Sequence, residues 1–436
     1  MLTLKHKKAG IGRRKLPGCR NLLRLAVCAG LVPAALFSQT PLTWEQIKAK
    51  FIAENPTLKA AALSIDESRA AEITAYLRPN PDLTITADGV QLTPNEIWRP
   101  VGGVYESPAI SYLHERQHKR ELRLANAKKS TEIAASSYLD QERGLIFNLR
   151  AAFANVLQAK AFQDNARLNL AYWDKELGVD RRRLETGDIA QVDYDRLALQ
   201  RVQFESDFET ATVNLRTAKI QLLMLLNDRT PIEQFDVSGP YDFAELKLPL
   251  EEFRNIALET RPDLKVAFEN VGLAKLAYQL AVSNGSTDPT FTMWYSHNPS
   301  FANSLADNTM GGSISIPLRI FDRNQGEKAR TQVDISRNQR LYDAAKAQVF
   351  NDVDSAYVTI VSTVNLLRPY KEQYLEMAAT IRDRVSFAYQ RGGASLLDYL
   401  DAEKSYRDTR LAYLNLIGSY LAAAAQMNQA VGREVL

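Results

Sequence analysis

Few polar side chains in this sequence are spaced so that they could act together. Asp398 and Asp401 stand three residues apart in the segment Leu397–Ala402, which places both carboxylates on one face of a helix. Like charges held close together raise each other's pKa or bind a cation. The alternative interpretation is a solvated helix face, with Arg407 nearby to balance the charge.

Patterns for catalysis or metal binding are weak. His114 and His118 are four residues apart, the spacing of two zinc ligands on one helix face, but no HExxH pattern, cysteine or acidic cluster accompanies them. The sequence has no Gly-rich phosphate loop, nucleophile elbow or Cys–His pair. We therefore expect no enzyme, no cofactor and no metal site.

The first 38 residues differ from the rest. They carry eight basic and no acidic side chains, so the formal charge of +3 for all 436 residues becomes −5 without them, which disfavours a nucleic-acid binder. An apolar run, 21–37, precedes small residues near Ser38, the order of a secretory signal peptide over residues 1–38. A membrane anchor or a lipidated Cys28 are the alternatives.

Cys19 and Cys28 are the only cysteines, so the rest of the chain has no disulfide or thiol chemistry.

Two long blocks contain almost no proline. None occurs between Pro108 and Pro231, and after Pro317 only Pro369 appears, which should interrupt a helix. Gly187 breaks the first block, and Gly392 and Gly393 break the second, as helix reversals require. We predict long helical hairpins over about 115–227 and 323–434. Heptad stripes support them: Phe204, Phe208, Ala211, Leu215, Ala218, Leu222 and Leu225, then Leu411, Leu414, Gly418, Leu421 and Ala425.

The sequence also repeats itself. The segments 55–59 and 261–265, 192–194 and 397–399, and 81–84 and 289–292 resemble each other at offsets of about 206 residues. This regularity predicts two copies of one unit, residues 39–228 and 229–436.

Before each hairpin the residues alternate between apolar and polar, which predicts a strand pair in about 82–113 and another in about 289–318. Four strands are too few to close a barrel, and open edges are costly in lipid. If the strands enter a membrane, two or three chains must share one barrel. The alternative is a soluble sheet capping a helical bundle. Aromatic residues typical of membrane interfaces cluster here: Trp98, Tyr105, Tyr112, Trp294 and Tyr295.

This arrangement resembles the TolC-type outer-membrane efflux protein family, over about residues 41–434, and most of all its shorter heavy-metal and cation (cobalt-zinc-cadmium type) members. The motifs are 187–193 and 392–401, with His118-Lys119-Arg120 and Ile316-Pro317-Leu318 in support. The resemblance implies a mainly α fold with a small β part. It further implies a trimeric 12-stranded β-barrel continuous with an α-helical periplasmic tunnel.

The resemblance also implies roles for residues of the two glycine breaks. Asp398 and Asp401 would form carboxylate rings that gate the lumen and select cations. Asp193, Tyr389 and Arg391 would make the contacts that close the tip, although Ala394 stands where some members have an arginine. The turns themselves would dock an adaptor, through Gly187, Asp188, Ile189, Gly392 and Gly393.

The expected function is therefore a passive outer-membrane exit duct in a Gram-negative cell, with a long periplasmic extension. Its expected partners are two further copies of the chain, a periplasmic adaptor, an inner-membrane pump of RND type and outer-membrane lipid, with no nucleic acid. The expected substrates are metal cations or small toxic compounds. A type I protein or peptide secretion role and a periplasmic coiled-coil scaffold without a pore are the alternatives.

Overall fold

The computed structural model describes residues 41–90, 92, 104–297 and 307–436, which belong to one compact unit. The expected signal peptide, Cys28 and Trp98 lie outside the described residues.

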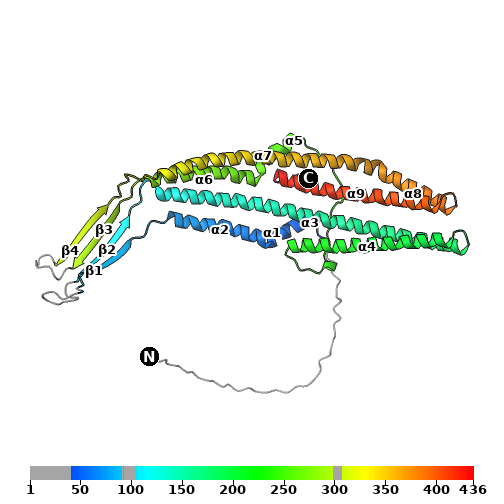
Figure 1. Cartoon of the computed structure of the whole chain (residues 1–436), viewed down its shortest axis with the longest axis horizontal. Coiled ribbons are helices and arrows are strands. Elements are labelled where there is room, and N and C mark those ends of the chain that lie inside the picture. The colour runs from blue at the N-terminus through cyan, green and yellow to red at the C-terminus, as the bar shows by residue number, and fades with distance from the viewer. Residues whose placement is uncertain (1–40, 91, 93–103, 298–306) are drawn as a thin grey trace, which may run out of the picture. The chain divides into compact units, whose positions relative to one another are not determined.

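The same order of elements occurs twice along this unit (Figure 1). The first series is α1 (Trp44–Glu54), α2 (Pro56–Tyr76), β1 (Asp82–Asp88), β2 (Tyr105–Leu113), α3 (Lys119–Glu185) and α4 (Gln191–Leu225). A short 3₁₀ turn, η1 (Ile232–Gln234), follows. The second series is α5 (Leu250–Thr260), α6 (Pro262–Asn284), β3 (Thr290–His297), β4 (Asn308–Ser315), α7 (Gln325–Pro369), the π-helical turn η2 (Tyr370–Tyr374), α8 (Leu375–Gln390) and α9 (Leu396–Val431).

The four strands form one antiparallel sheet in the order β1-β2-β3-β4. Its register places Leu83, Ile110 and Met293 side by side on one face. Neighbouring positions such as Asp82, Ser111 and Thr292 line up on the other face. The predicted strand pairs are thus confirmed, but β4 ends at Ser315 and not at Leu318. Pro317 has no N–H to continue the ladder.

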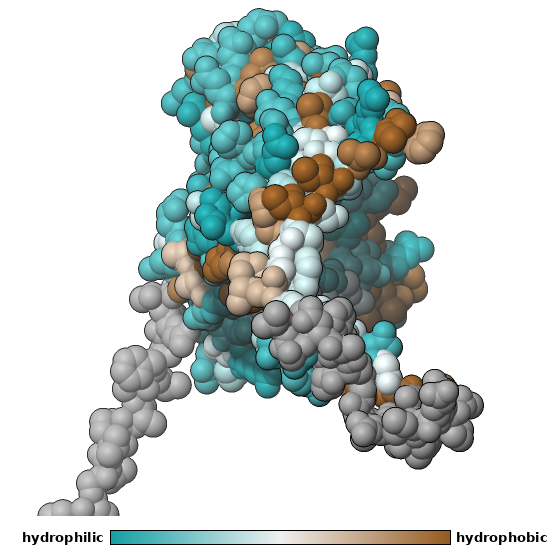
Figure 2. All heavy atoms as spheres, turned by 90° about the vertical axis from the view of Figure 1, so that its left-hand side faces the viewer, coloured by the Kyte–Doolittle hydropathy of each residue, from teal (hydrophilic) through white to brown (hydrophobic). Residues whose placement is uncertain are grey.

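The apolar face of the sheet is solvent-exposed in the single chain. Ile85 is 72% exposed and Met310 is 75% exposed. Figure 2, which looks onto the end that carries the strands, shows hydrophobic side chains gathered among hydrophilic ones.

The predicted aromatic belt is corrected by the register. Trp294 and Tyr295 are consecutive in β3 and point to opposite faces. Trp294 lies on the polar face over Gly311, where an added Cβ would meet the indole at 2.5 Å. Tyr105 shares that face, whereas Tyr112 and Tyr295 lie on the apolar one. Of the described aromatic residues in this set, Tyr112 and Tyr295 share the apolar face, and their role at a membrane interface stays a prediction.

The long helices pack through apolar stripes. The predicted stripe of α4 is confirmed, with Phe204, Leu215 and Leu222 buried. The stripe predicted for α9 is confirmed in part, with Ala425 buried and Leu421 packed against the core. The buried surface of α9 is wider than this stripe, because α9 packs against both α3 and α7 and also buries Ile417 and Met427. Gly418 allows the close approach that the sequence indicates: an added Cβ would meet the Gln158 side chain of α3 at 2.6 Å.

Pro369 interrupts the second long helix, as predicted. The α-helical pattern of α7 ends at Pro369, and the next five residues form a π-helical turn before α8. Proline lacks the N–H that the α-helical ladder needs, so the hydrogen bonds change register at this point. No helix of the described ranges is long and apolar enough to cross a membrane.

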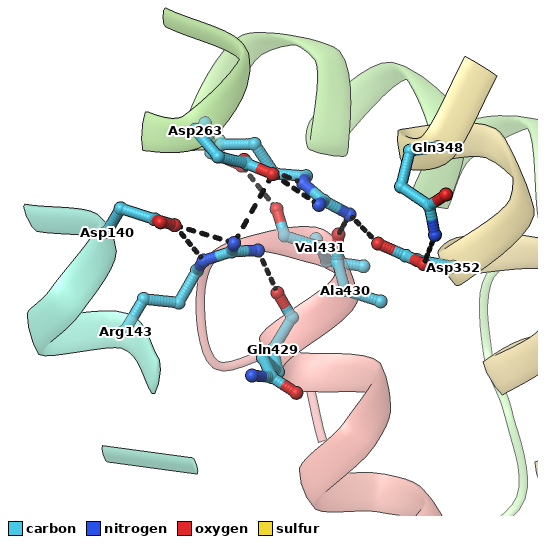
Figure 3. A network of polar contacts seen from close by, with 10 residues as sticks. Asp140, Arg143, Asp263, Gln348, Asp352, Gln429, Ala430 and Val431 are labelled. Atoms are coloured by element: carbon cyan, nitrogen blue, oxygen red, sulfur yellow. Dashed lines mark hydrogen bonds and ion pairs between the residues drawn. The ribbon is translucent and has the colours of Figure 1, made fainter. Parts of the chain in front are cut away.

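Two arginines join the first long helix to the later ones around the end of α9 (Figure 3). Arg143 of α3 donates to the Gln429 carbonyl at 2.8 Å and pairs with Asp140 at 2.6 Å. A third contact from Arg143 reaches Asp263 of α6 at 3.4 Å. Positive charge at these carbonyls suits the negative end of the helix dipole.

Arg261 completes this connection from the break between α5 and α6. Its buried guanidinium pairs with Asp263 at 2.6 Å and with Asp352 of α7 at 2.8 Å, and it donates to the Ala430 carbonyl at 3.2 Å. The pKa of Asp263 is lowered, although burial alone would raise it, because Arg261 and Arg143 stabilise its charged form. We call these residues the Arg261 joint: Arg143, Arg261, Asp263, Asp352 and the α9 carbonyls.

Candidate functional site

The two glycine breaks form turns with the same geometry. In the first, Gly187 has φ +81° and donates to the Leu184 carbonyl at 3.0 Å, while Asp188 donates to the Arg183 carbonyl at 2.8 Å. In the second, Gly392 has φ +76° and donates to the Tyr389 carbonyl at 3.1 Å. These bonds are those of the Schellman motif, whose left-handed residue is normally glycine. The predicted helix reversals are therefore confirmed. Nothing in the described structure tests Gly187, Asp188, Ile189, Gly392 and Gly393 as docking residues, and their role stays a prediction.

The helices that leave the two turns begin differently. Ser395 caps α9: its N–H donates to Asp398 at 3.0 Å and its hydroxyl accepts from the Asp398 N–H at 3.2 Å. This is a capping box. At the equivalent position α4 has Ala190, which has no side chain that can cap. Asp193, the counterpart of Asp398, lies 3.8 Å from Arg196 of its own helix.

Asp398 and Asp401 are both exposed in the first turns of α9. The Ser395 hydroxyl and N–H lower the pKa of Asp398. Within one chain, Asp398 is thus stabilised as a carboxylate, the opposite of the rise that crowding of like charges would cause. Its carboxylate has a structural role at the helix start in addition to any role in a ring.

A stack of aromatic rings holds the four helices together just inside the turns. Tyr389 of α8 and Tyr399 of α9 are parallel at 4.9 Å, and Tyr399 is parallel to Trp173 of α3 at 6.0 Å. Trp173 also donates to the Leu197 carbonyl of α4 at 2.9 Å. All of these side chains are buried. Both tyrosine hydroxyls are buried without a partner in the described residues.

One arginine connects the first hairpin to the second. Arg183 of α3 pairs with Asp180 at 3.0 Å, donates to the Tyr389 carbonyl at 3.3 Å and lies 4.8 Å from the centre of the Tyr389 ring. This contact was not predicted. Its only sequence signal is the Asp180–Arg183 spacing of three residues before the first turn.

Three carboxyl groups lie in the same contact and are partly desolvated. Burial raises the pKa of Glu176, Asp180 and Glu403. One oxygen of Glu403 is buried without a hydrogen bond in the described structure. Burial also raises the pKa of the neighbouring Tyr172 to about 12. We call the set Glu176, Asp180, Arg183, Tyr389 and Glu403 the tip contact.

The tip-closing role of Asp193, Tyr389 and Arg391 stays a prediction, and within the single chain no hydrogen bond joins Tyr389 to Asp193. Arg391 stacks on Phe387 of its own hairpin at 4.4 Å. Ala394 packs against the aromatic stack, where a small apolar side chain fits. Within the single chain, Arg183 is the residue that contacts Tyr389 from the first hairpin.

The two histidines have no metal-site geometry. His118 lies 3.9 Å from Glu121, and His114 packs edge-on against Phe291. Among the residues that the structure describes, no three potential metal ligands lie close together.

Comparison with known proteins identifies the architecture. Residues 254–433 match the family of outer membrane efflux proteins. The chain is 23% identical over 400 residues to the cobalt-zinc-cadmium resistance protein CzcC of Cupriavidus metallidurans, covering 90% of each chain. It is 22% identical over 421 residues to the outer membrane protein TolC of Vibrio cholerae, covering 92% of this chain and 94% of that one. A crystal structure of CusC matches with a TM-score of 0.76 at 18% identity, covering 89% of this chain and 92% of that chain. Residues 254–433 therefore belong to the outer membrane efflux protein family, and the chain is similar to such proteins over most of its length.

Proposed function

We propose that this protein is the outer-membrane channel of a tripartite efflux system, a passive exit duct fed by an inner-membrane pump through a periplasmic adaptor. The observation that carries the proposal is the sheet: four strands with one apolar face and two open edges, joined to helices far longer than the sheet. The similarity to CzcC, TolC and CusC supports it.

The sheet fits a membrane only as part of a larger one. One face exposes Leu83, Ile85 and Met293, while the other carries Thr84, Thr86 and Ser313, the alternation of a strand between lipid and water. The N–H and C=O groups on the outer edges of β1 and β4 would be unsatisfied in lipid. Three copies would close twelve strands, with β4 of one chain antiparallel to β1 of the next.

The helices fit a long tunnel on the periplasmic side. Helix α3 has 67 residues, which at 1.5 Å per residue is about 100 Å. Its sheet-proximal end would meet the membrane and its other end, with both glycine turns, would reach the adaptor. Small residues and free backbone groups at the turns suit end-on contact with another helical hairpin.

The tips would be the gate. Asp398 and Asp401 of three chains would form two carboxylate rings that favour cations and disfavour anions. Opening would move α8 and α9 relative to α3, which requires the tip contact to part. The similarity to CzcC favours metal cations as cargo, with small toxic compounds as the alternative.

Planar bilayer recordings test the gate. Asp398→Asn with Asp401→Asn should weaken block by multivalent cations by roughly tenfold or more, because the rings lose their charge. Asp334→Asn with Asp343→Asn on α7 is the matched control and should leave the block unchanged. Equal block in wild type and the tip variant would reject the gate assignment.

Export tests the docking surface. Inserting a rigid pair of prolines after Gly187 or after Gly392 should abolish export in cells, because the turn no longer matches its partner. Conductance of the same variants in bilayers should persist, since the strands are unaltered. Normal export would show that these turns do not dock.

A further inference from the structure

Basic side chains gather where the chain passes between helices and strands. Arg78 lies between α2 and β1, Arg116 lies between β2 and α3, and Arg319 and Arg323 lie between β4 and α7. We call these four arginines the basic collar. Three separate crossings from helix to strand thus contribute to it.

One carboxylate, Asp288 between α6 and β3, contacts the crossing from β2 to α3. It accepts from the Arg116 N–H at 2.9 Å and from Lys119 at 2.5 Å. Its pKa is lowered, although burial alone would raise it, because of these bonds and the charges of Lys119 and Arg319. Asp288 thus pairs with the charge of Lys119 and lies near that of Arg319, whereas Arg116 contributes only its backbone N–H. Asp322 is a further acid beside Arg319 and Arg323, and the four arginines of the collar still leave an excess of positive charge.

The collar arginines themselves form no ion pair among the described residues. Arg78 and Arg116 line a recess of about 430 Å³ whose two acids, Glu115 and Glu121, already pair with Arg123 and Arg120. The Arg323 side chain donates from Nε to the Arg319 carbonyl at 3.2 Å. Nε of Arg319 is buried without a partner, a state that an anionic oxygen would relieve.

Exposed apolar side chains alternate with these arginines. After β4, Leu318 is 78% exposed and Phe321 is 90% exposed, on either side of Arg319. Ile314, on the apolar face near the end of β4, is exposed as well. Arginine beside exposed apolar residues is typical of the boundary between hydrocarbon and headgroups, where the stem lies in the apolar layer and the charge reaches water.

We propose that the basic collar binds the phosphodiester headgroups of anionic phospholipids in the leaflet next to the helices. This inference rests on the proposed membrane role of the sheet. A planar guanidinium pairs with two phosphate oxygens at once. The negative charge of the lipid complements the excess of positive charge on the collar arginines. Leu318 and Phe321 would enter the acyl layer and hold the arginines at headgroup depth.

Native mass spectrometry of the full-length processed protein tests the inference. The protein in mild detergent is mixed with equal amounts of phosphatidylglycerol and phosphatidylethanolamine, and the bound lipids are counted. We expect phosphatidylglycerol to be enriched roughly fivefold or more. R78Q/R116Q/R319Q/R323Q should bind the two lipids equally. The control R69Q/R167Q/R337Q/R340Q removes four exposed arginines of the helices, each paired within its own helix, and should keep the enrichment.

Further measurements distinguish lipid headgroups from free phosphate, and failure of the collar from failure of the proposed function. Inorganic phosphate, added at the ionic strength of a chloride control, should not displace the lipid; displacement would show a simple ion site and overturn the inference. If the quadruple variant does not fold, the double variants R78Q/R116Q and R319Q/R323Q are made separately. Each should lower the enrichment of phosphatidylglycerol, and unchanged enrichment in both would also overturn the inference. A conducting oligomer without lipid preference defeats the collar alone, whereas a chain that never enters bilayers defeats the proposed function.

Discussion

The Arg261 joint and the tip contact both connect the first long hairpin to later helices, but they treat buried charge in opposite ways. At the joint, two carboxylates surround a buried guanidinium, and the pKa of Asp263 is lowered. At the tip, burial raises the pKa of Glu176, Asp180 and Glu403, and part of Glu403 has no partner. The carboxylates of the joint are thus stabilised by their arginines, whereas at the tip Arg183 pairs with Asp180 and burial still raises the pKa of all three carboxyl groups.

This difference suits the parts that the two regions would have in a gated duct. A fixed point needs each charge paired, because separating a paired buried charge is costly. A moving end needs a contact that can part, and carboxylates that burial disfavours regain water when α8 and α9 move away. The aromatic stack supplies cohesion that does not depend on protonation.

Arg261→Met should have the largest effect. It leaves Asp263, Asp352 and the Ala430 carbonyl without their cation, so we expect the free energy of unfolding to fall by about 3 kcal/mol. Thermal unfolding followed by circular dichroism in detergent measures this. Arg69→Met, which breaks an exposed pair with Asp66, should cost less than about 0.5 kcal/mol. An equal loss of unfolding free energy in the two variants would mean that the Arg261 joint contributes no more than an exposed ion pair.

Glu403→Gln should act in the other direction. It removes a charge that burial disfavours, so the tip contact should open less often at neutral pH. Hydrogen exchange of α8 and the first turns of α9 should slow by roughly three- to tenfold. Glu372→Gln, in the exposed π-helical turn, should not change it. Faster exchange in Glu403→Gln would contradict the assignment of Glu403 as an unfavourable buried charge.

The two helix starts give a smaller and symmetric effect. Ser395→Ala removes the capping box and should cost α9 about 1 kcal/mol, while the pKa of Asp398 rises back toward its ordinary range. Ala190→Ser should stabilise α4 by a similar amount, because Asp193 already stands three residues later. Exchange rates of the first-turn amides and an NMR titration of the two aspartates measure this. Unchanged exchange rates and aspartate pKa values in both variants would show that the caps do not stabilise these helices.

Acidification should have the smallest effect, with opposite signs in the two regions. A raised carboxyl pKa means that the folded state takes up the proton first, so the tip contact gains stability as pH falls from neutral toward about 5. The lowered pKa of Asp263 means that the joint keeps its stability until pH falls below about 4, the ordinary carboxyl range, and then loses it. Exchange at both regions, corrected for intrinsic rates, checks this. Loosening of both regions together above pH 5 would be inconsistent with it.

Local signals predicted most of the architecture. Glycine with a required positive φ marked both turns, Pro369 marked the interruption, and alternation marked all four strands. These signals act within a few residues of the chain. The full width of the buried surface on α9 was not predictable in the same way, since it depends on two neighbouring helices that are distant in sequence.

The site was harder to predict for the same reason. The contact of Arg183 with Tyr389 joins residues 206 positions apart, and nothing near either one indicates it. The spacing of Ser395 and Asp398 by three residues is the sequence signal of a capping box. From the sequence, Asp398 was assigned to a carboxylate ring and not to this cap. Grouping Trp294 with Tyr295 as interface aromatics overlooked the two-residue period of a strand, which sends neighbours to opposite faces.

Cross-linking of the sheet edges tests the central claim, that three chains share one closed barrel. The processed chain has no cysteine of its own if residues 1–38 are removed. One cysteine replaces Thr84 or Thr86 on β1, another replaces Ser313 on β4, and a short thiol cross-linker is added to cells. Denaturing electrophoresis should then show a ladder that ends at three chains, and either single variant should remain a monomer, because equivalent strands of neighbouring chains are four strands apart. Monomers only in the double variant, or a ladder that continues past three, would contradict the account.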